Sequence, residues 1–205
     1  MKAAVKHIIF DLGGVILNID YQKPIQAFAD LGIHTLYSKA AQSTLFDELE
    51  TGRISGDDFL NNLVKMAQKG TTPQQIKQAW NSIILDFPIR RLQLLQQLQL
   101  HYDLYLLSNT NEIHEEAFNQ ILFSTCGYPN LAMFFDKVYL SHRVGLRKPD
   151  PAIFQLVLEQ NQIKPEETLF LDDSPQHIET ASKLGIQTIH VTEDRGMLDI
   201  FLPKQ

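Results

Sequence analysis

Five short apolar runs constrain the fold of this chain more than any other feature of its sequence. They are His7-Ile8-Ile9-Phe10, Leu104-Tyr105-Leu106-Leu107, Lys137-Val138-Tyr139-Leu140, Leu169-Phe170-Leu171 and Ile186-Gln187-Thr188-Ile189-His190-Val191. Runs of this length without apolar–polar alternation are typical of strands buried on both faces, as in parallel sheets. The first four are followed by polar residues, namely Asp11, Ser108, Ser141 and Asp172. We therefore expect polar side chains to gather at the carboxyl ends of parallel strands.

Helical patterns lie between the later runs. Asp150 is a good N-cap, and Pro151 suits the first position of a helix. Ser174 is the expected cap of a further helix, which ends at Gly185. Strands that alternate with helices predict an α/β fold with a doubly wound parallel sheet. In such Rossmann-like sheets, ligands bind at the carboxyl ends of the strands.

One connection is far longer than a crossover requires. About ninety residues separate Asp11 from Leu104, whereas a strand-to-strand crossover needs only about a dozen. Apolar residues recur there at helical spacing, at Ile25, Phe28, Ala29 and Leu31 and again at Phe59, Leu60, Leu63 and Met66. We expect residues 18–87 to form an inserted helical cap over an α/β core made of residues 1–17 and 88–205. Such a cap excludes water and selects substrates.

Charge and cysteine content restrict the partners of the chain. Its 205 residues carry a formal net charge of −6, which disfavours broad binding to nucleic acid or to an anionic membrane. Cys126 is the single cysteine, which excludes an intrachain disulfide and fits a reducing compartment. The sequence shows no membrane span, and the apolar stretch after Lys6 stops at Asp11, too early for a secretory signal. We expect a cytoplasmic protein.

Asp11 lies between the first apolar run and the segment Leu12-Gly13-Gly14-Val15. Two glycines after a strand let the backbone turn sharply and bring amides close to a ligand. A carboxylate at this point can attack phosphorus and form an aspartyl-phosphate. From this segment alone, an Asp that merely caps a turn is an equal alternative.

Three further segments carry groups suited to phosphate chemistry. Ser108-Asn109-Thr110 offers a hydroxyl and amides for phosphoryl oxygens, although it equally suits a helix cap. Lys148, in a stiff segment before Pro149, can neutralise negative charge, although most lysines are solvated. The adjacent carboxylates Asp172-Asp173 at the end of a buried strand are costly without a cation. Together with Asp11 they form an all-oxygen set that suits Mg²⁺.

In this order the segments resemble the four motifs of the haloacid dehalogenase-like hydrolases. The matching segments are His7-Ile8-Ile9-Phe10-Asp11-Leu12-Gly13-Gly14-Val15, Leu106-Leu107-Ser108-Asn109-Thr110, Gly145-Leu146-Arg147-Lys148-Pro149 and Phe170-Leu171-Asp172-Asp173-Ser174. Within that family the chain most resembles sugar-1-phosphate phosphatases of the bacterial glucose-1-phosphate type. Those proteins have a cap segment similar to Glu48-Leu49-Glu50-Thr51-Gly52-Arg53-Ile54-Ser55 and share the Ser-Asn-Thr-Asn run of residues 108–111.

The resemblance implies a Mg²⁺-dependent phosphatase that acts on a small phosphorylated metabolite, such as a sugar 1-phosphate. It implies that Asp11 is both the nucleophile and a metal ligand. The backbone carbonyl of Gly13 and the carboxylate of Asp173 are further implied ligands, and Asp172 is implied to act directly or through water. Lys148 is implied to bridge the phosphoryl group and Asp11.

The resemblance also implies the substrate contacts. Ser108 and Asn109 are implied to bind the phosphoryl group, together with Lys148. Arg53 follows Gly52 in the matching cap segment, so it is expected to contact substrate hydroxyls or to stabilise the closed cap. A solvated loop arginine is an equal alternative for Arg53.

Two positions depart from the family pattern. Gly13 stands where most family phosphatases carry a second Asp, the general acid and base, although the glucose-1-phosphate type shares the glycine. Without that proton donor, we expect anomeric, aryl and acyl phosphates to be better substrates than primary alkyl phosphates. His177 stands where many members have an acidic residue. We expect His177 to be a surface residue, which weakens the support around the metal ligands and Lys148.

Three other functions compete with phosphatase activity. A haloacid dehalogenase of the same superfamily needs no metal, so the acidic pair argues against it. A non-catalytic phosphate-binding or regulatory protein on this scaffold would explain Gly13, but Asp11, Ser108, Lys148 and Asp173 argue against a decayed site. In a phospho-acceptor switch of the response-regulator kind, the acidic pair usually follows the first strand, which is not the order here.

Overall fold

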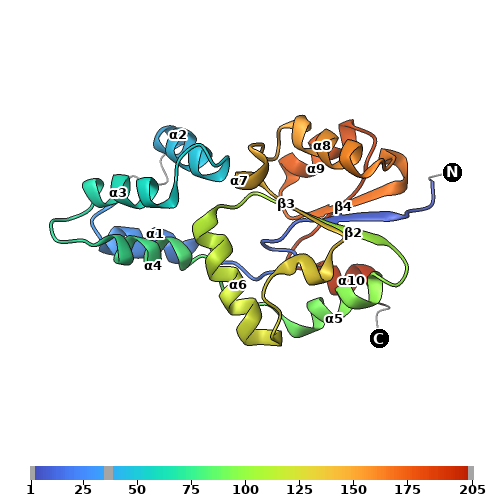
Figure 1. Cartoon of the computed structure of the whole chain (residues 1–205), viewed down its shortest axis with the longest axis horizontal. Helices are drawn as coiled ribbons and strands as arrows, with labels where there is room; N and C mark the ends of the chain where they lie inside the picture. The colour runs from blue at the N-terminus through green and yellow to red at the C-terminus, as the bar shows by residue number, and fades with distance from the viewer. Residues whose placement is uncertain (1–2, 35–38, 203–205) are drawn as a thin grey trace.

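A five-stranded parallel sheet forms the centre of the molecule (Figure 1). The structure, a computed structural model, describes residues 3–34 and 39–202. The strands are β1 (His7–Phe10), β2 (Asp103–Ser108), β3 (Lys137–Leu140), β4 (Thr168–Asp172) and β5 (Gln187–His190). Their spatial order is β3-β2-β1-β4-β5. The α/β fold with a doubly wound parallel sheet that the sequence predicts is thus confirmed.

The register of β1 places Asp11 between two other strand ends. Ile8 pairs with Leu104 of β2 on one side and with Leu169 of β4 on the other. The ladder continues one residue past β1, where the amide of Asp11 donates to the carbonyl of Leu171 at 2.9 Å. Because the central strand ends level with its neighbours, the residues that follow β1, β2 and β4 meet at one edge.

Both faces of the sheet are covered by helices, as Figure 1 shows. Ile8 and Phe10 pack into an apolar cluster with α5 (Ile89–Leu98), α6 (Glu112–Cys126) and α10 (Met197–Phe201). Ile9 points to the opposite face, where it packs with α8 (Pro151–Asn161) and α9 (Pro175–Lys183). Successive strand residues alternate between two apolar layers. That arrangement explains why the strands are apolar at nearly every position.

Of the two predicted helix caps, the structure contains the one at Asp150 but not the one at Ser174. Asp150 accepts a hydrogen bond from the amide of Ala152 at 2.9 Å, and Pro151 is the first residue of α8, so this cap is confirmed. Ser174 occupies the N-cap position of α9, but its side chain makes no capping bond. Its amide donates instead to Asp172 Oδ1 at 2.7 Å. The prediction that the Ser174 hydroxyl caps α9 is therefore wrong.

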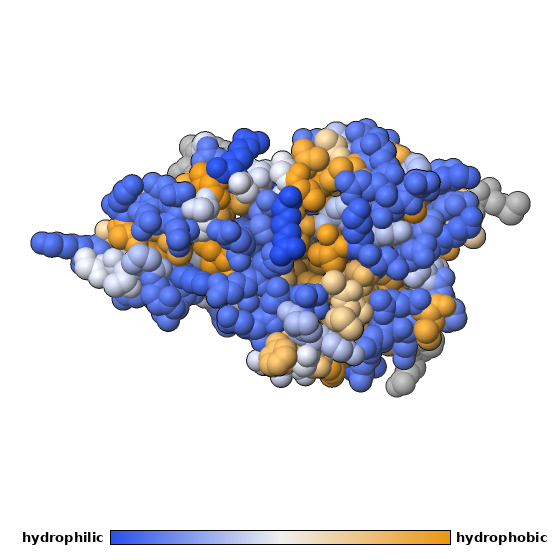
Figure 2. Space-filling model, in the orientation of Figure 1, coloured by the Kyte–Doolittle hydropathy of each residue, from blue (hydrophilic) through white to orange (hydrophobic). Residues whose placement is uncertain are grey.

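Short elements complete the connections between the strands. They are α7 (Ser141–Val144) and two 3₁₀ turns, Leu131–Phe134 and Pro165–Glu167. No helix among residues 3–34 and 39–202 is long and apolar enough to cross a membrane. The face in Figure 2 is mostly hydrophilic, and its hydrophobic residues lie in separate groups over the sheet and over the helices beside it.

Four helices beyond the carboxyl ends of the strands form a separate packing unit, which we call the helical unit (Figure 1). They are α1 (Gln22–Asp30), α2 (Lys39–Glu50), α3 (Gly56–Met66) and α4 (Pro73–Asn81). The shared cluster contains Phe28, Leu49, Phe59, Leu63 and Trp80, with Ile113 of α6 at its border. Of the residues expected to face inward, Ile25 and Met66 are instead exposed.

The chain enters and leaves the helical unit along two paired segments. Ile19 forms an antiparallel bridge with Ile84. The amide of Asn18 donates to the carbonyl of Asp86 at 2.9 Å, and the amide of Leu85 donates to the carbonyl of Asn18 at 3.0 Å. The two crossings lie next to the predicted boundaries of residues 18–87. The division into core and cap stays a prediction, which this pairing supports.

Candidate active site

Three carboxylates meet at the carboxyl edge of the sheet. Asp11 follows β1, Asp172 ends β4 and Asp173 comes next. One oxygen from each lies within 4.8 Å of the others. Carboxylate oxygens in such a group are suitable ligands for a hard divalent cation. The residues therefore fit Mg²⁺, and Gly13, whose carbonyl is the fourth expected ligand, lines the same cavity.

Gly14 shapes the loop beside these carboxylates. Its φ angle is +74°, in the left-handed region. A Cβ atom at Gly14 would lie 2.5 Å from Asp173 Oδ2. Both its backbone conformation and its closeness to Asp173 therefore require glycine. This observation supports the expectation that the glycine pair allows a sharp turn against the site.

Lys148 is fully buried among the carboxylates. Its Nζ donates to Asp11 Oδ1 at 2.6 Å, to Asp172 Oδ2 at 2.7 Å and to the carbonyl of Leu107 at 2.8 Å. An ammonium group has three N–H donors, so all three are engaged. Lys148 thus orients Asp11. The expected contact with a phosphoryl group requires it to exchange one of these partners.

The buried charges shift each other's pKa values. Burial raises the pKa of Asp11 to about 7, and Asp172 and Asp173 add to the rise, whereas Lys148 opposes it. Burial acts to lower the pKa of Lys148, but Asp11 and Asp172 outweigh it and raise that pKa above its usual value. Lys148 is therefore a permanent cation. A bound divalent cation adds positive charge that favours ionised Asp11.

His177 contacts the site, contrary to the expectation that it is a surface residue. Its Nδ1 lies 2.9 Å from Asp172 Oδ1, and its side chain is only 18% exposed. Burial acts to raise the pKa of Asp172, but Lys148 and His177 together lower it below its usual value. The histidine thus supports Asp172 where many family members use an acidic residue. The prediction that His177 weakens the support around the site was wrong, because the fold brings the histidine ring into contact with Asp172.

The end of β2 is tied to the loop that carries Lys148. Asn109 Nδ2 donates to the carbonyl of Lys148 at 2.8 Å, and Asn109 Oδ1 accepts from the amide of Lys148 at 2.8 Å. The Asn109 side chain therefore positions Lys148, a role that the sequence did not indicate. Ser108 is 3% exposed and lines the cavity, so its expected phosphoryl contact stays a prediction.

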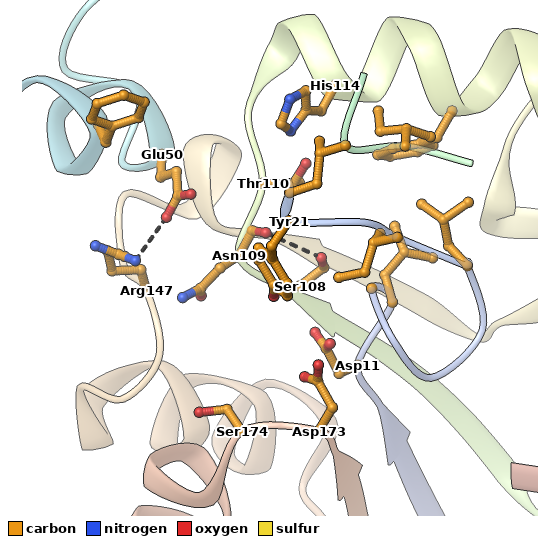
Figure 3. A pocket seen from close by; sticks show the side chains of 18 of the residues that line it. Asp11, Tyr21, Glu50, Ser108, Asn109, Thr110, His114, Arg147, Asp173 and Ser174 are labelled. Carbon is orange, nitrogen blue, oxygen red and sulfur yellow. Dashed lines mark hydrogen bonds and ion pairs between the residues drawn. The ribbon is translucent and has the colours of Figure 1, made fainter. Parts of the chain in front are cut away.

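A cavity of about 560 Å³ opens above these groups. Figure 3 shows Asp11 and Asp173 pointing toward each other on one side, with Ser108, Asn109 and Thr110 along the wall that β2 supplies. Side chains of the helical unit and its connections complete the lining. They include Ile19, Tyr21, Phe46, Asp47, Glu50, Trp80, Ile83 and Ile84. The cavity therefore lies between the sheet edge and the helical unit.

Glu50 and Arg147 form an ion pair on the side of the cavity away from Asp11 and Asp173 (Figure 3). Arg147 Nη2 lies 2.9 Å from Glu50 Oε2, and Arg147 Nη1 pairs with Asp47. Both acids belong to α2, whereas Arg147 immediately precedes Lys148. The sequence analysis missed Arg147 and Glu50 as cavity residues. Their positions next to Lys148 and within the matched cap segment were the available signals.

Arg53 is exposed and is not among the residues that line the cavity. Gly52, with a φ angle of +66°, packs against the backbone carbonyl of His142, where a Cβ atom would clash. The segment thus contacts α7 through Gly52, and the arginine that reaches the cavity is Arg147. The structure does not bring Arg53 to the other site residues, and its substrate contact stays a prediction.

Comparison with known proteins relates this geometry to a family. A family model for the hydrolase family "haloacid dehalogenase-like hydrolase" matches residues 5–185. The chain belongs to this family. The match spans strands β1 to β4, and it includes Asp11, Ser108, Lys148 and Asp173.

Relatives of this haloacid dehalogenase-like chain include a protein named as a phosphatase and solved structures of the same family. A D-ribitol-5-phosphate phosphatase from Bacteroides thetaiotaomicron is 38% identical over 187 residues, which cover 90% of each chain. A haloacid dehalogenase family enzyme from the same organism, solved as a magnesium complex, is 33% identical with a TM-score of 0.89. The alignment covers 98% of this chain and 100% of that one. A structure of the wild-type enzyme holds magnesium and inorganic phosphate.

A predicted hydrolase of the family from Porphyromonas gingivalis is 33% identical, with a TM-score of 0.82 and coverage of 92% of this chain and 91% of that one. These matches and the carboxylate cluster confirm two predictions. The chain is a phosphatase of the haloacid dehalogenase-like family, and its cofactor is Mg²⁺. The dehalogenase and non-catalytic alternatives are accordingly set aside.

The two adjacent carboxylates have different surroundings, which predicts different effects of substitution. Asp173 lines the cavity, whereas Asp172 is fully buried and bound to Lys148, His177 and the amide of Ser174. We expect Asp173→Asn to weaken Mg²⁺ activation by more than about 10- to 100-fold, which is the cost of losing a residue that only supports a metal ligand. Asp172→Asn is expected to reduce thermal stability more than Mg²⁺ affinity. Mg²⁺ titrations of turnover and melting curves of both variants test this order, and the reverse order contradicts it.

Proposed function

We propose that this phosphatase hydrolyses the phosphate monoester of a small sugar alcohol, such as D-ribitol 5-phosphate, with Asp11 as the nucleophile. The observation that carries the proposal is the position of Asp11. Its carboxylate is held by Lys148 at 2.6 Å, next to Asp173, in a cavity of about 560 Å³. Cavities of roughly 300–1,000 Å³ are typical of small-molecule sites.

The two ends of the cavity suit the two parts of such a substrate. Asp11, Asp173 and Ser108 lie where the phosphoryl group would react. Arg147, together with Tyr21, presents polar groups to the remainder of the ligand. A polyol needs many hydrogen-bonding partners, and unpaired polar groups of the site would disfavour a ligand without hydroxyls. The relative named for D-ribitol 5-phosphate supports this class of leaving group.

The chain's own residues account for the first chemical step. Lys148 fixes one oxygen of Asp11, which leaves the other free to attack phosphorus in line with the leaving oxygen. Ser108 donates a hydrogen bond from its hydroxyl group to a phosphoryl oxygen. Asn109 keeps Lys148 in place through two hydrogen bonds to its backbone. Mg²⁺, when bound by Asp11, Asp173 and the Gly13 carbonyl, supplies positive charge that offsets the phosphoryl charge.

The helical unit is proposed to act as the cap. It contributes Phe46, Glu50 and Trp80 to the cavity and joins the rest of the chain through two paired segments. Closure would exclude water during phosphoryl transfer. Arg147, which pairs with Asp47 and Glu50, would hold α2 against the loop of Lys148 in the closed arrangement.

A sugar 1-phosphate is the second candidate substrate, since it follows from the sequence resemblance and from Gly13. D-ribitol 5-phosphate is a primary ester, whose alkoxide needs more help to leave than the anomeric oxygen of a sugar 1-phosphate. The sugar alcohol phosphate is the first choice because the relative at 38% identity carries that activity in its name.

A substrate panel tests the proposed function. D-Ribitol 5-phosphate, glucose 1-phosphate and glucose 6-phosphate would be assayed with Mg²⁺ and with EDTA. We expect kcat/KM for D-ribitol 5-phosphate to exceed both others at least about tenfold, which equals about 1.4 kcal/mol of transition-state stabilisation. EDTA should abolish all activity. A preference for glucose 1-phosphate, or activity that survives EDTA, contradicts the proposal.

A further inference from the structure

Gly13 leaves the proposed reaction without an acid beside the nucleophile. The alkoxide of a primary alcohol is a poor leaving group, and general acid catalysis is typically worth about 10²- to 10⁴-fold. If the proposed function holds, another group in the cavity must supply this proton. The inference below rests on that function and names the group.

We propose that Glu50 of α2 protonates the leaving oxygen and then, as a carboxylate, activates the water that hydrolyses the aspartyl-phosphate. Glu50 lies on the helical unit and faces the cavity from the side opposite Asp11 (Figure 3). The substrate would lie between them. An in-line reaction places the leaving oxygen on the far side of phosphorus from Asp11, which is the side that Glu50 faces.

The Glu50 side chain is mostly buried, and one oxygen of its carboxyl group lacks a hydrogen-bond donor. Its side chain is 19% exposed, and Oε2 lies 2.9 Å from Arg147 Nη2. That oxygen nevertheless accepts no directed hydrogen bond from any described residue. The contact with Arg147 therefore lacks the geometry of a hydrogen bond, and Oε2 keeps a lone pair that can bind a proton. A buried oxygen without a donor is costly unless a ligand or a proton satisfies it.

Burial raises the pKa of Glu50 to about 7, although the charge of Lys148 opposes the shift. A group with such a pKa is present in both protonation states near neutral pH, as an acid–base catalyst requires. The influence of Lys148 also places Glu50 in the electrostatic field of the reaction centre. Tyr21 lines the same cavity. Burial raises its pKa, and then Asp173, Asp11, Asp172 and Glu50 raise it further.

Other titratable side chains that line the cavity are less suited to the role. His114 is committed, because Nε2 contacts the carbonyl of Trp80 at 3.2 Å and Nδ1 contacts Asn111. Burial lowers the pKa of His114 to about 4, so it is neutral and has no acidic proton to give. His177 Nδ1 is bound to Asp172. Asp47 accepts a directed hydrogen bond from Arg147 Nη1, whereas Glu50 Oε2 accepts none. Tyr21, with its raised pKa, retains its proton.

The charged groups around Glu50 come from several elements. Arg147 and Lys148 lie on the loop before α8, Asp47 lies one turn earlier on α2, and Tyr21 precedes α1. On α7, which packs against α2, the side chains of His142 and Arg143 are bound by Glu115 of α6. On α3, which also packs against α2, the acids of the first turn, Asp57 and Asp58, are exposed.

The two steps balance as follows. Asp11 attacks phosphorus, an Asp11–phosphorus bond forms, and the bond from phosphorus to the leaving oxygen breaks. That oxygen keeps the electron pair and takes the proton of Glu50, which releases the alcohol and leaves a Glu50 carboxylate. Water then attacks phosphorus and passes a proton to Glu50, and the Asp11–phosphorus bond breaks. The products are inorganic phosphate, free Asp11 and protonated Glu50.

Leaving-group dependence tests the role of Glu50. The substrates are D-ribitol 5-phosphate and 4-nitrophenyl phosphate, whose phenolate leaves without a proton. We expect Glu50→Gln to lower single-turnover phosphoryl transfer from D-ribitol 5-phosphate at least about 100-fold. Transfer from 4-nitrophenyl phosphate should change less than about threefold, since it needs no acid. Glu48→Gln, on the same helix but outside the cavity lining, is the matched control and should alter neither rate.

The wild-type protein provides a second measurement that no folding defect affects. Since Glu50 loses its proton above its pKa of about 7, the ratio of the alkyl rate to the aryl rate in the first step should fall as pH rises through 7. In Glu50→Gln this fall should disappear. Equal losses on both substrates, no loss on either, or a pH-independent ratio in the wild type would each overturn the proposal.

A failure of the proposed substrate can be distinguished from a failure of the Glu50 proposal. If Mg²⁺-dependent hydrolysis of 4-nitrophenyl phosphate is normal in wild type but D-ribitol 5-phosphate is not turned over, the substrate assignment fails. The Glu50 proposal is then decided with a primary alkyl phosphate that the panel shows to be turned over. If no primary alkyl phosphate is turned over, the active site needs no acid for its leaving group, and the assignment of Glu50 is overturned as well.

Discussion

Asp11→Asn is expected to lower phosphatase turnover at least about a thousandfold, because it removes the attacking charge while it keeps the shape of the side chain. Asp11 is the carboxylate that Lys148 holds at 2.6 Å and that lies within reach of Asp172 and Asp173. The amide is a poor nucleophile and also a weaker ligand for a hard cation. The measurement is single-turnover release of inorganic phosphate with saturating Mg²⁺.

A matched variant separates chemistry from folding. Asp103→Asn changes a carboxylate that is 57% exposed at the start of β2, the opposite edge of the same sheet. We expect it to retain near-normal turnover. Mass spectrometry of rapidly quenched wild type should also show a phosphorylated protein that Asp11→Asn lacks. Turnover by purified Asp11→Asn close to that of the wild type would show that Asp11 is not the nucleophile.

Lys148→Met is expected to damage both stability and activity. The substitution leaves the buried carboxylates of Asp11 and Asp172 without their shared cation. Removing one partner of a buried ion pair typically costs about 3–5 kcal/mol of unfolding free energy. Turnover should fall at least about a hundredfold, because misplaced reacting groups lose that much or more. Urea unfolding in EDTA and steady-state assays with Mg²⁺ measure the two effects.

The control for this variant is Lys183→Met on α9. That lysine is 71% exposed and forms only a surface pair with Glu179, which solvent screens. It should change the unfolding free energy of the protein little and leave turnover intact. A Lys148→Met protein as stable and active as this control would show that the buried lysine is replaceable, contrary to its three hydrogen bonds.

The sequence was sufficient to predict the sheet and the groups at its edge. Residues 7–10, 104–107 and 169–171 are apolar at nearly every position because both faces of the sheet are covered. A parallel sheet brings the carboxyl ends of its strands to one edge, so Asp11, Ser108 and Asp172-Asp173 had to be neighbours. This inference needs only the apolar runs and the polar residues that follow them along the chain. It requires no knowledge of side-chain contacts.

The apolar pattern of the sequence did not predict which side chains surround those groups. His177 was expected on the surface, but α9 begins close enough to β4 for its ring to reach Asp172 at 2.9 Å. Asn109 was assigned to the phosphoryl group, but its side chain hydrogen-bonds to the backbone of Lys148. Both contacts join segments that are distinct elements of the fold, and a helical or strand pattern carries no information about rotamer or approach.

The sequence by itself determined the fold class, the placement of the chemistry-bearing residues after strand ends and the metal-binding character of the site, because the apolar runs and the order of the motifs along the chain express these directly. Only the tertiary structure decided which residues of the helical unit face the reaction. Arg53 lies outside the cavity, whereas Glu50 and Arg147 line it. The physical reason is that the helical unit has its own apolar cluster. Its internal packing is encoded locally, but the way it meets the sheet depends on a few contacts, such as Gly52 on the His142 carbonyl and Arg147 with Asp47 and Glu50.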